Sequence, residues 1–154
     1  MDGDGYPTLD SAEIETRSIL ADDGVFTTLA FVTLDGTGNR EFSFARKPGA
    51  DTQLRFEDLD LSLIDEAKVF HFGTLSLTDE PARSATYQAV AYDKSKGKLI
   101  TYDPNLRKPL WRSMEDAKQQ LLWGLRQADI VKISNEEVEF LFGLGVKEGA
   151  AHIL

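Results

Sequence analysis

The stretch KLITYDPNLR, residues 98–107, says most about the fold of this chain. Its first half is a short apolar run, which favours a buried strand, and its second half holds an acid, a proline, an amide and an arginine. Two other stretches share this form: EAKVFHFG, residues 66–73, and ADIVKISNEE, residues 128–137. Each is a short β-run that ends in small or polar residues, so the sequence predicts three similar strands.

Segments with helical spacing separate these runs. They are DEPARSATYQAVAYDKSK at 79–96 and SMEDAKQQLLWGLRQ at 113–127, the second of which starts with Ser113 followed three residues later by Asp116. After the third run, NEEVEFLFGLG at 135–145 predicts a short helix that ends at a glycine. Strands alternating with helices of this length predict βαβ crossovers, and hence a Rossmann-like α/β fold with three layers, a parallel sheet covered by helices on both faces.

A different pattern precedes the three runs. TTLAFVTL at 27–34 is rich in β-branched and aromatic residues, DGTGN at 35–39 supplies turn chemistry, and REFSFAR at 40–46 alternates polar with apolar side chains. The sequence therefore predicts a β-hairpin that carries Phe42 and Phe44 on one face.

The composition limits the possible partners. With 42% hydrophobic residues among 154, the chain can build one globular domain, and its net charge of −9 argues against nucleic acid or an anionic membrane surface as the main partner. The chain has no cysteine, which excludes disulfides and thiolate metal sites and suits the reducing cytoplasm. The first ten residues, MDGDGYPTLD, lack the features of a signal peptide and predict no regular structure. We therefore expect a cytoplasmic domain.

The polar ends of the three strands should meet. Ligands bind beyond the carboxyl ends of the strands in parallel sheets, and these ends carry HFGT, DPNLR and SNEE. If the segment after the second strand stays extended, Asp103, Asn105 and Arg107 face one side and could share a ligand, with the arginine fork suited to phosphate oxygens. The alternative is a plain turn, in which Asp103 caps, Asn105 satisfies backbone groups and Arg107 pairs with a surface acid.

The SNEE segment also has two interpretations. Ser134, Glu136 and Glu137 stand where a strand passes into a helix, and carboxylates stabilise a helix N-terminus without any further role. A glutamate there could equally hold a Mg²⁺-bound water, because magnesium keeps most of its hydration. We expect His71 to be a buried or sheet-edge histidine and not a base, and for Trp111 and Trp123 we expect packing roles.

Taken together, these motifs resemble a known family. TTLAFVTLDGTGNREFSFARKPGAD, VFHFGTLSL, LITYDPNLR and DIVKISNEEVEFLFG, in this order, resemble the middle of a PfkB (ribokinase-like) carbohydrate kinase, most closely the fructokinases. The resemblance implies a partial ribokinase-like domain over 1–154, with a lid hairpin at about 27–46 and a βαβ core at about 66–154. It also implies ATP and Mg²⁺ as cofactors, and transfer of the ATP γ-phosphate to a sugar hydroxyl, with D-fructose converted to fructose 6-phosphate.

The resemblance assigns sugar-binding residues. Phe44 and Arg46 resemble lid residues that face the sugar, although many relatives carry Phe or Tyr where this chain has Ala45. Gly73 and Thr74 resemble the strand end under the sugar.

It also assigns residues around the phosphates. Arg107 resembles an arginine near both the sugar and the transferred phosphate, and Asn105 lies near the phosphates. The family's Asn-x-x-Glu magnesium motif falls on Ser134 to Glu137, so Glu137 takes the glutamate role through a water and Ser134 replaces the asparagine.

The resemblance leaves some parts of the site outside these residues. The family's Gly-Ala-Gly-Asp motif, with the catalytic base, should follow Leu154, and its first sugar-binding region should precede Met1. PGAD at 48–51 lacks the second glycine, so Asp51 is not assigned as the base and no catalytic residue is expected within the chain. We therefore expect a fragment with negligible kinase activity by itself, which oligomerises or dissolves poorly because its sheet is exposed.

Two alternatives remain at this point. The chain could be a non-catalytic module that dimerises through the lid, as the full-length protein is expected to do. It could also belong to a kinase of the same family that acts on another sugar, such as ribose, 2-keto-3-deoxygluconate or a nucleoside.

Overall fold

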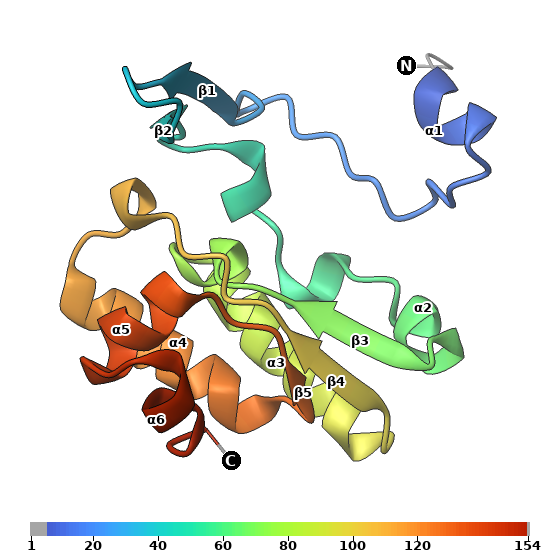
Figure 1. Cartoon of the computed structure of the whole chain (residues 1–154). Helices are drawn as coiled ribbons and strands as arrows, with labels where there is room; N and C mark the ends of the chain where they lie inside the picture. The colour runs from blue at the N-terminus through green and yellow to red at the C-terminus, as the bar shows by residue number, and fades with distance from the viewer. Residues whose placement is uncertain (1–5, 154) are drawn as a thin grey trace.

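The computed structural model describes residues 6–153 and contains the predicted parallel sheet (Figure 1). Its strands are β3 (Val69–Phe72), β4 (Leu99–Tyr102) and β5 (Ile130–Val131), in the order β3-β4-β5. Both neighbouring pairs are parallel, with Val69 opposite Leu99 and Thr101 opposite Ile130. The prediction of three strands joined by helical crossovers is confirmed.

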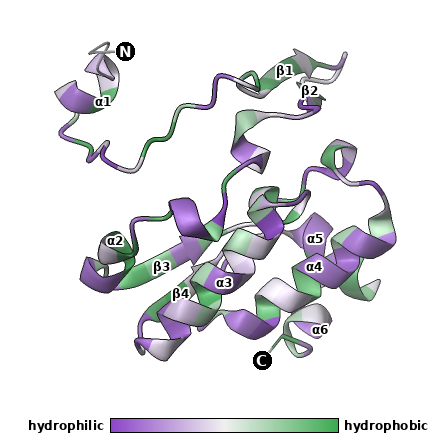
Figure 2. Ribbon diagram, turned by 180° about the vertical axis from the view of Figure 1, so that it is seen from behind, coloured by the Kyte–Doolittle hydropathy of each residue, from purple (hydrophilic) through white to green (hydrophobic). Residues whose placement is uncertain are grey.

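Two helices form the crossovers. They are α3 (Ala82–Ser95) and α4 (Met114–Gln127), and the side chain of Ser113 accepts a hydrogen bond from the Asp116 N–H at the start of α4, as its sequence predicts. Figure 2 shows both helices lying across the same side of the sheet. This placement follows from two right-handed crossovers that step along the sheet in one direction.

The two faces of the sheet differ within residues 6–153. Phe72, Ile100 and Tyr102 are buried under the helices. On the opposite face, Val69 and Leu99 form one cross-strand pair and are 46% and 40% exposed. His71 lies on this face too and is exposed, with its Nδ1 2.8 Å from the Thr101 hydroxyl. Within the described residues, α3 and α4 therefore cover one face of the sheet, and the face that carries Val69 and Leu99 is exposed (Figure 2).

The core beneath the helices depends on a close approach. A Cβ at Gly124 in α4 would lie 2.3 Å from the Tyr102 ring, so the helix can cross the strand only with glycine there. Trp123 packs edge-on against Phe72, and Trp111 is 7% exposed. Both tryptophans therefore have the packing roles that the sequence predicts.

The predicted hairpin is formed by β1 (Leu29–Leu34) and β2 (Arg40–Ala45), which are antiparallel. Asp35 closes its turn by accepting hydrogen bonds from the Thr37 hydroxyl and from the N–H groups of Asn39 and Thr37, and these bonds lower its pKa to about 2. The hairpin lies on the side of the sheet to which the strands point, and β2 contacts the loop after β4 (Figure 1). The hairpin therefore lies beyond the carboxyl ends of the strands (Figure 1).

Shorter elements complete the chain. Two helices follow β5, α5 (Asn135–Phe142), which ends at Gly143 with φ 65°, and α6 (Val146–Ala150). The start of the chain differs from expectation, because Pro7–Ser11 forms the helical turn α1 with its proline in the first turn, where the missing N–H costs nothing. Residues 1–5 of that expected irregular segment lie outside the described residues. The remaining elements are α2 (Leu61–Glu66) and the 3₁₀ turns η1 (Ala50–Thr52), η2 (Phe56–Asp58), η3 (Leu75–Leu77) and η4 (Lys108–Leu110).

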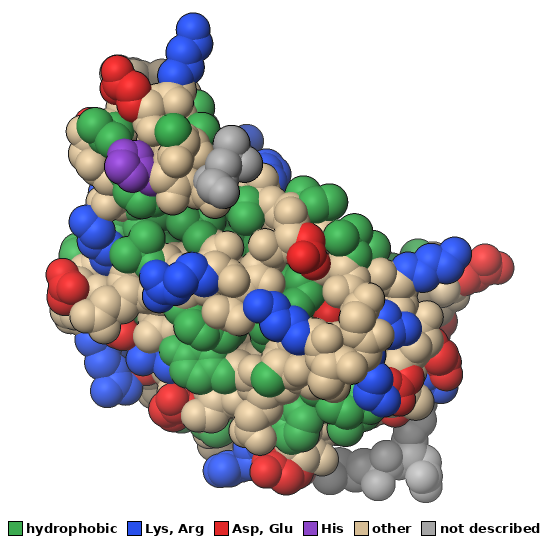
Figure 3. All heavy atoms as spheres, turned by 90° about the horizontal axis from the view of Figure 1, so that it is seen from below, with side chains coloured by type: hydrophobic (Ala, Val, Ile, Leu, Met, Phe, Trp, Pro, Cys, Tyr) green, Lys and Arg blue, Asp and Glu red, His purple; other side chains and the backbone are tan. Residues whose placement is uncertain are grey.

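The surface carries charges of both signs. Seen from below, basic and acidic side chains are interspersed with apolar ones (Figure 3). Within the described residues, no helix has the length and apolar character needed to cross a bilayer.

Candidate functional site

Backbone contacts join the ends of the three strands. Both the N–H and the hydroxyl of Thr74 donate to the carbonyl oxygen of Pro104, at 3.0 and 2.6 Å. At Gly73 a Cβ would lie 2.8 Å from the Asp103 carbonyl oxygen, so the ends of β3 and β4 approach too closely for a side chain. The Leu106 N–H in turn donates to Oε1 of Glu137, at 2.7 Å. The predicted convergence at one sheet edge is therefore present.

The loop after β4 brings its three polar residues together by an unexpected conformation. Asp103, Asn105 and Arg107 all line one hollow of about 270 Å³. The extended backbone expected for them is absent, because Asn105 has φ 50° in the left-handed region, which asparagine tolerates better than most residues. The prediction of an extended segment is therefore wrong. The three side chains nevertheless line the same hollow, as predicted.

Glu137 and Ser134 form a capping box at the start of α5. The Ser134 hydroxyl accepts from the Glu137 N–H, and Oε2 of Glu137 accepts from the Ser134 N–H at 2.9 Å. With the bond from Leu106, both carboxylate oxygens have backbone donors, and Glu137 is 6% exposed. The capping interpretation of SNEE is confirmed, and the same carboxylate also holds the loop after β4.

Arg107 is held differently from its neighbours. Its guanidinium carbon lies 4.8 Å from the ring centroid of Phe42 on the hairpin, and its hydrogen bond, from Nη1, reaches the Leu106 carbonyl oxygen at 3.4 Å. Among residues 6–153 no carboxylate forms an ion pair with Arg107. The expected turn alternative, with Arg107 paired to a surface acid, is therefore not observed, and most N–H donors of Arg107 remain available.

A lysine that the sequence did not single out lies at the same hollow. Lys132 donates to Asp103 at 2.7 Å, and this hydrogen bond raises the pKa of the lysine. The Lys132 side chain is 81% exposed. The hollow thus has cationic groups from Arg107, Lys108 and Lys132 on its rim.

Arg46 lines a hollow between the hairpin and the body of the chain, but its guanidinium is bound by groups of the chain itself. It is 8% exposed, its Nε and Nη2 donate to Asp51, and Nη1 donates to Thr78 at 2.7 Å. Its Nη2 also donates to the Leu75 carbonyl. A buried arginine must be paired in this way, and the result ties the base of the hairpin to η3.

Asp51, the acid of the PGAD segment, accepts the hydrogen bonds from Arg46. Burial opposes its ionisation, but hydrogen bonds from Arg46 and Thr28 outweigh burial and hold its pKa below the usual value. A carboxylate paired in this way stays ionised and accepts hydrogen bonds. Asp51 therefore has a structural role at the base of the hairpin.

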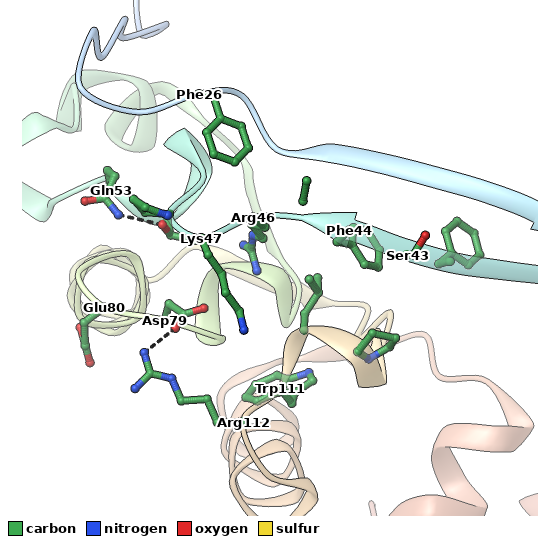
Figure 4. Close-up of a pocket in the computed structure, with 16 residues that line it drawn as sticks. Phe26, Ser43, Phe44, Arg46, Lys47, Gln53, Asp79, Glu80, Trp111 and Arg112 are labelled. Atoms are coloured by element: carbon green, nitrogen blue, oxygen red, sulfur yellow. Dashed lines mark hydrogen bonds and ion pairs between the residues drawn. The ribbon is translucent and has the colours of Figure 1, made fainter.

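The other predicted sugar residues are distributed over two hollows. Gly73 and Thr74 line one of about 280 Å³ together with Asn105, but Thr74 is fully buried and its hydroxyl is bound to Pro104. Phe44 lines a larger hollow of about 1080 Å³ between the hairpin and the body. Figure 4 shows Lys47 extending into this hollow and the aromatic ring of Trp111 in its wall.

The described residues offer few groups that could bind Mg²⁺. Within the described residues no cluster of three or more His, Asp or Glu side chains could hold an ion directly. Glu137 has one backbone donor on each oxygen, so each oxygen keeps a lone pair that could accept from a metal-bound water. The site therefore fits an indirect role for Glu137 and does not fit a direct metal ligand set.

Comparison with known proteins gives consistent similarities. The model of a family described as pfkB family carbohydrate kinase matches residues 7–153. A probable fructokinase-2 of Arabidopsis thaliana is 50% identical over 131 residues, which are 85% of this chain. The chain spans about 40% of the length of that relative.

Solved structures resemble the chain over most of its length. A fructokinase from Xylella fastidiosa with bound ATP has a TM-score of 0.84 and 30% identity, covering 96% of this chain and 46% of that protein. A fructokinase from Vibrio cholerae, in a form with fructose, ADP and calcium ion bound, has a TM-score of 0.83 and 30% identity, covering 96% and 47%.

Proposed function

The chain belongs to the pfkB family of carbohydrate kinases, and we propose from this premise that it carries the lid and the phosphate side of a fructokinase site. The reaction proposed for the whole protein is transfer of the ATP γ-phosphate to a hydroxyl of D-fructose, giving fructose 6-phosphate. A cytoplasmic location is part of the proposal, supported by a chain without cysteine.

One observation carries the proposal: the guanidinium of Arg107 has no carboxylate partner among residues 6–153 and lines a hollow with Asn105. Phosphoryl transfer depends mainly on positioning and on stabilising the charge of the phosphate oxygens. An arginine with free N–H donors suits this task, because its fork matches two phosphate oxygens at once. The left-handed Asn105 keeps its amide at the same rim.

The proposed sugar contacts are Phe44 on the lid and the open backbone at Gly73. Arg107 lies at the strand ends, between the lid and the proposed phosphate site, so it could bind both the sugar and the phosphate. Arg46 and Thr74 hold the lid base and the strand ends through their internal hydrogen bonds, and we assign them positioning roles. Fructose is proposed because similar proteins are fructokinases, and one of them was solved with fructose and ADP.

Magnesium belongs to the proposal as an ion carried by the nucleotide. When bound, it would neutralise charge on the phosphate oxygens. Glu137 would accept a hydrogen bond from one of the waters of the ion, while its backbone contacts hold the carboxylate in place.

Ligand-observed NMR of the 154-residue chain tests the choice of sugar. We expect saturation transfer to D-fructose that exceeds transfer to D-ribose, 2-keto-3-deoxygluconate and adenosine, and that falls in Arg107→Gln. Equal transfer to all four compounds, or stronger transfer to one of the other three, would show that the fructose assignment is wrong.

A second candidate is a non-catalytic module that associates through the hairpin. All six residues of β1 are exposed, and Leu29, Phe31, Val32 and Leu34 are each more than half exposed. Large apolar side chains gathered on a two-stranded sheet favour association. Sedimentation at several concentrations should show a dimer that dissociates in Leu34→Glu, and a monomer at all concentrations would remove this candidate.

A further inference from the structure

The lid reaches the anion site through a contact between aromatic and cationic side chains. The guanidinium carbon of Arg107 lies 4.8 Å from the centroid of the Phe42 ring, and Phe42 stacks at 6.2 Å on Phe44. Phe42 and Arg107 are 65 positions apart in the chain, so only the docking of the hairpin brings them together. Neither residue pattern alone indicates this contact.

Holding an arginine by an aromatic face differs from holding it by a carboxylate. Arg46, Arg83 and Arg112 are paired with Asp51, Asp116 and Asp79, and each ion pair uses N–H donors of the arginine and offsets its charge. A ring face attracts the guanidinium through the quadrupole of the ring and accepts none of the in-plane N–H bonds. Arg107 is thereby fixed in place while its charge and its donors stay available to a ligand.

The geometry of β2 makes this contact depend on the lid position. Phe42 and Phe44 lie on one face of the strand, and Arg46, the residue that follows its end, is hydrogen-bonded to Thr78 and Leu75 at the base of the hairpin. Phe42 stands four residues from this anchor, about 13 Å along an extended strand. A small rotation of the hairpin about the anchor would therefore move the ring relative to Arg107.

We propose that Phe42 is a positioning residue, which holds Arg107 through its ring face and so couples the lid to anion binding at the strand ends. The inference rests on the proposed function, because it assumes that Arg107 binds the phosphates. It adds a residue that acts through Arg107 and that makes anion affinity respond to the lid.

The test uses tripolyphosphate as the anion and the 154-residue chain, with affinity measured by NMR titration. Phe42→Leu keeps an apolar side chain but removes the ring face, and a cation–π contact of this exposure predicts a loss of affinity of about 3- to 10-fold. Phe42→Tyr retains the ring and should bind within about twofold of the original chain. Phe31 pairs with Ser43 and so lies on the other face of the hairpin from Phe42. Phe31→Leu makes the same change there, and its affinity should also stay within about twofold of that of the original chain.

A double-mutant cycle separates positioning from a general effect on the fold. Arg107→Gln should weaken binding by about 10-fold or more, because it removes charge-assisted hydrogen bonds. The double variant Phe42→Leu/Arg107→Gln should bind no more weakly than Arg107→Gln alone. Without ligand, the side-chain protons of Arg107 should show ring-current shifts that disappear in Phe42→Leu and persist in Phe42→Tyr.

The outcomes distinguish this inference from the proposed function. If Arg107→Gln weakens binding while Phe42→Leu behaves like Phe31→Leu, or if the two losses add, Phe42 does not position Arg107 and the proposed function stands. If Arg107→Gln has no effect, or if the original chain does not bind tripolyphosphate, both are wrong. Absence of the ring-current shifts in the original chain also overturns the inference.

Discussion

The backbone N–H of Leu106 lies 2.7 Å from Oε1 of Glu137, and this hydrogen bond joins the loop after β4 to the first turn of α5. The other oxygen of the same carboxylate caps the helix through the Ser134 N–H. One buried side chain therefore fixes both the loop after β4 and the helix that follows the last strand of the described sheet.

Replacing Glu137 by glutamine should destabilise the protein. The amide has one acceptor oxygen for two backbone donors, and its NH₂ group would face an N–H, so we expect a loss of about 1–3 kcal/mol in the free energy of unfolding. Urea denaturation measures this loss. Glu139→Gln, an exposed position on the same helix, is the matched control and should stay within about 0.5 kcal/mol; equal effects of the two variants would contradict the role of Glu137.

The contact between α4 and β4 predicts a steric effect at Gly124. Its replacement by alanine places a Cβ 2.3 Å from the Tyr102 ring, and overpacking of this kind costs about 1–3 kcal/mol or more. Gly145→Ala meets nothing within 4 Å and serves as the control. Adding Tyr102→Leu to Gly124→Ala should recover part of the loss in thermal unfolding, whereas a strictly additive double variant would show that the clash is not the cause.

Two tyrosines should respond differently to loss of the hydroxyl group. The Tyr102 hydroxyl is buried and has no hydrogen-bond partner among residues 6–153, so Tyr102→Phe should leave stability unchanged or raise it by up to about 1 kcal/mol. The Tyr87 hydroxyl donates to Gln120, and Tyr87→Phe should cost about 1 kcal/mol. Chemical denaturation of both variants measures the difference, and an equal loss in both would be inconsistent with these environments.

Asp93 gives a prediction about pH. Its side chain is fully buried in α3 and has no hydrogen-bond partner within the described residues, and burial, with a smaller contribution from Asp129 against the opposing charge of Lys98, raises its pKa above 3.8. The folded protein then binds this proton more tightly than the unfolded chain, so the aspartate lowers stability progressively as pH rises above about 4. The stability of Asp93→Asn relative to the original chain should therefore increase from pH 4 upwards and then level off.

The control for this profile is Asp23→Asn, which changes an exposed carboxylate. Its unfolding free energy should stay within about 0.5 kcal/mol of that of the original chain. A difference for Asp93→Asn that does not change across pH 4–8 would mean that its buried carboxylate does not titrate abnormally.

Much of the fold could be predicted because its signals are local. The cap formed by Ser113 and Asp116, the glycine that ends α5, and the alternation that places Phe42 beside Phe44 are all encoded within a few residues. The grouping of the strand ends followed from the rule for parallel sheets, and the family resemblance followed from the order of the motifs.

The details of the site depended on contacts between distant residues. The tie of Arg46 to Thr78 spans 32 positions, and no pattern near Arg46 shows that its guanidinium is buried. The same holds for Phe42 over Arg107 and for Lys132 paired with Asp103. The left-handed conformation of Asn105 could have been predicted locally, since asparagine adopts that conformation readily. The alternation of side chains after β4 predicts an extended loop instead.

We propose that the strand ends around Arg107 form the phosphate side of the site. Titration of the isotopically labelled 154-residue chain with MgATP, followed through its backbone amide NMR signals, tests this assignment. The proposal predicts shifts concentrated at residues 105–108 and 132–137, and their loss in Arg107→Gln. Shifts that spare these two segments, or that persist unchanged in Arg107→Gln, would contradict it.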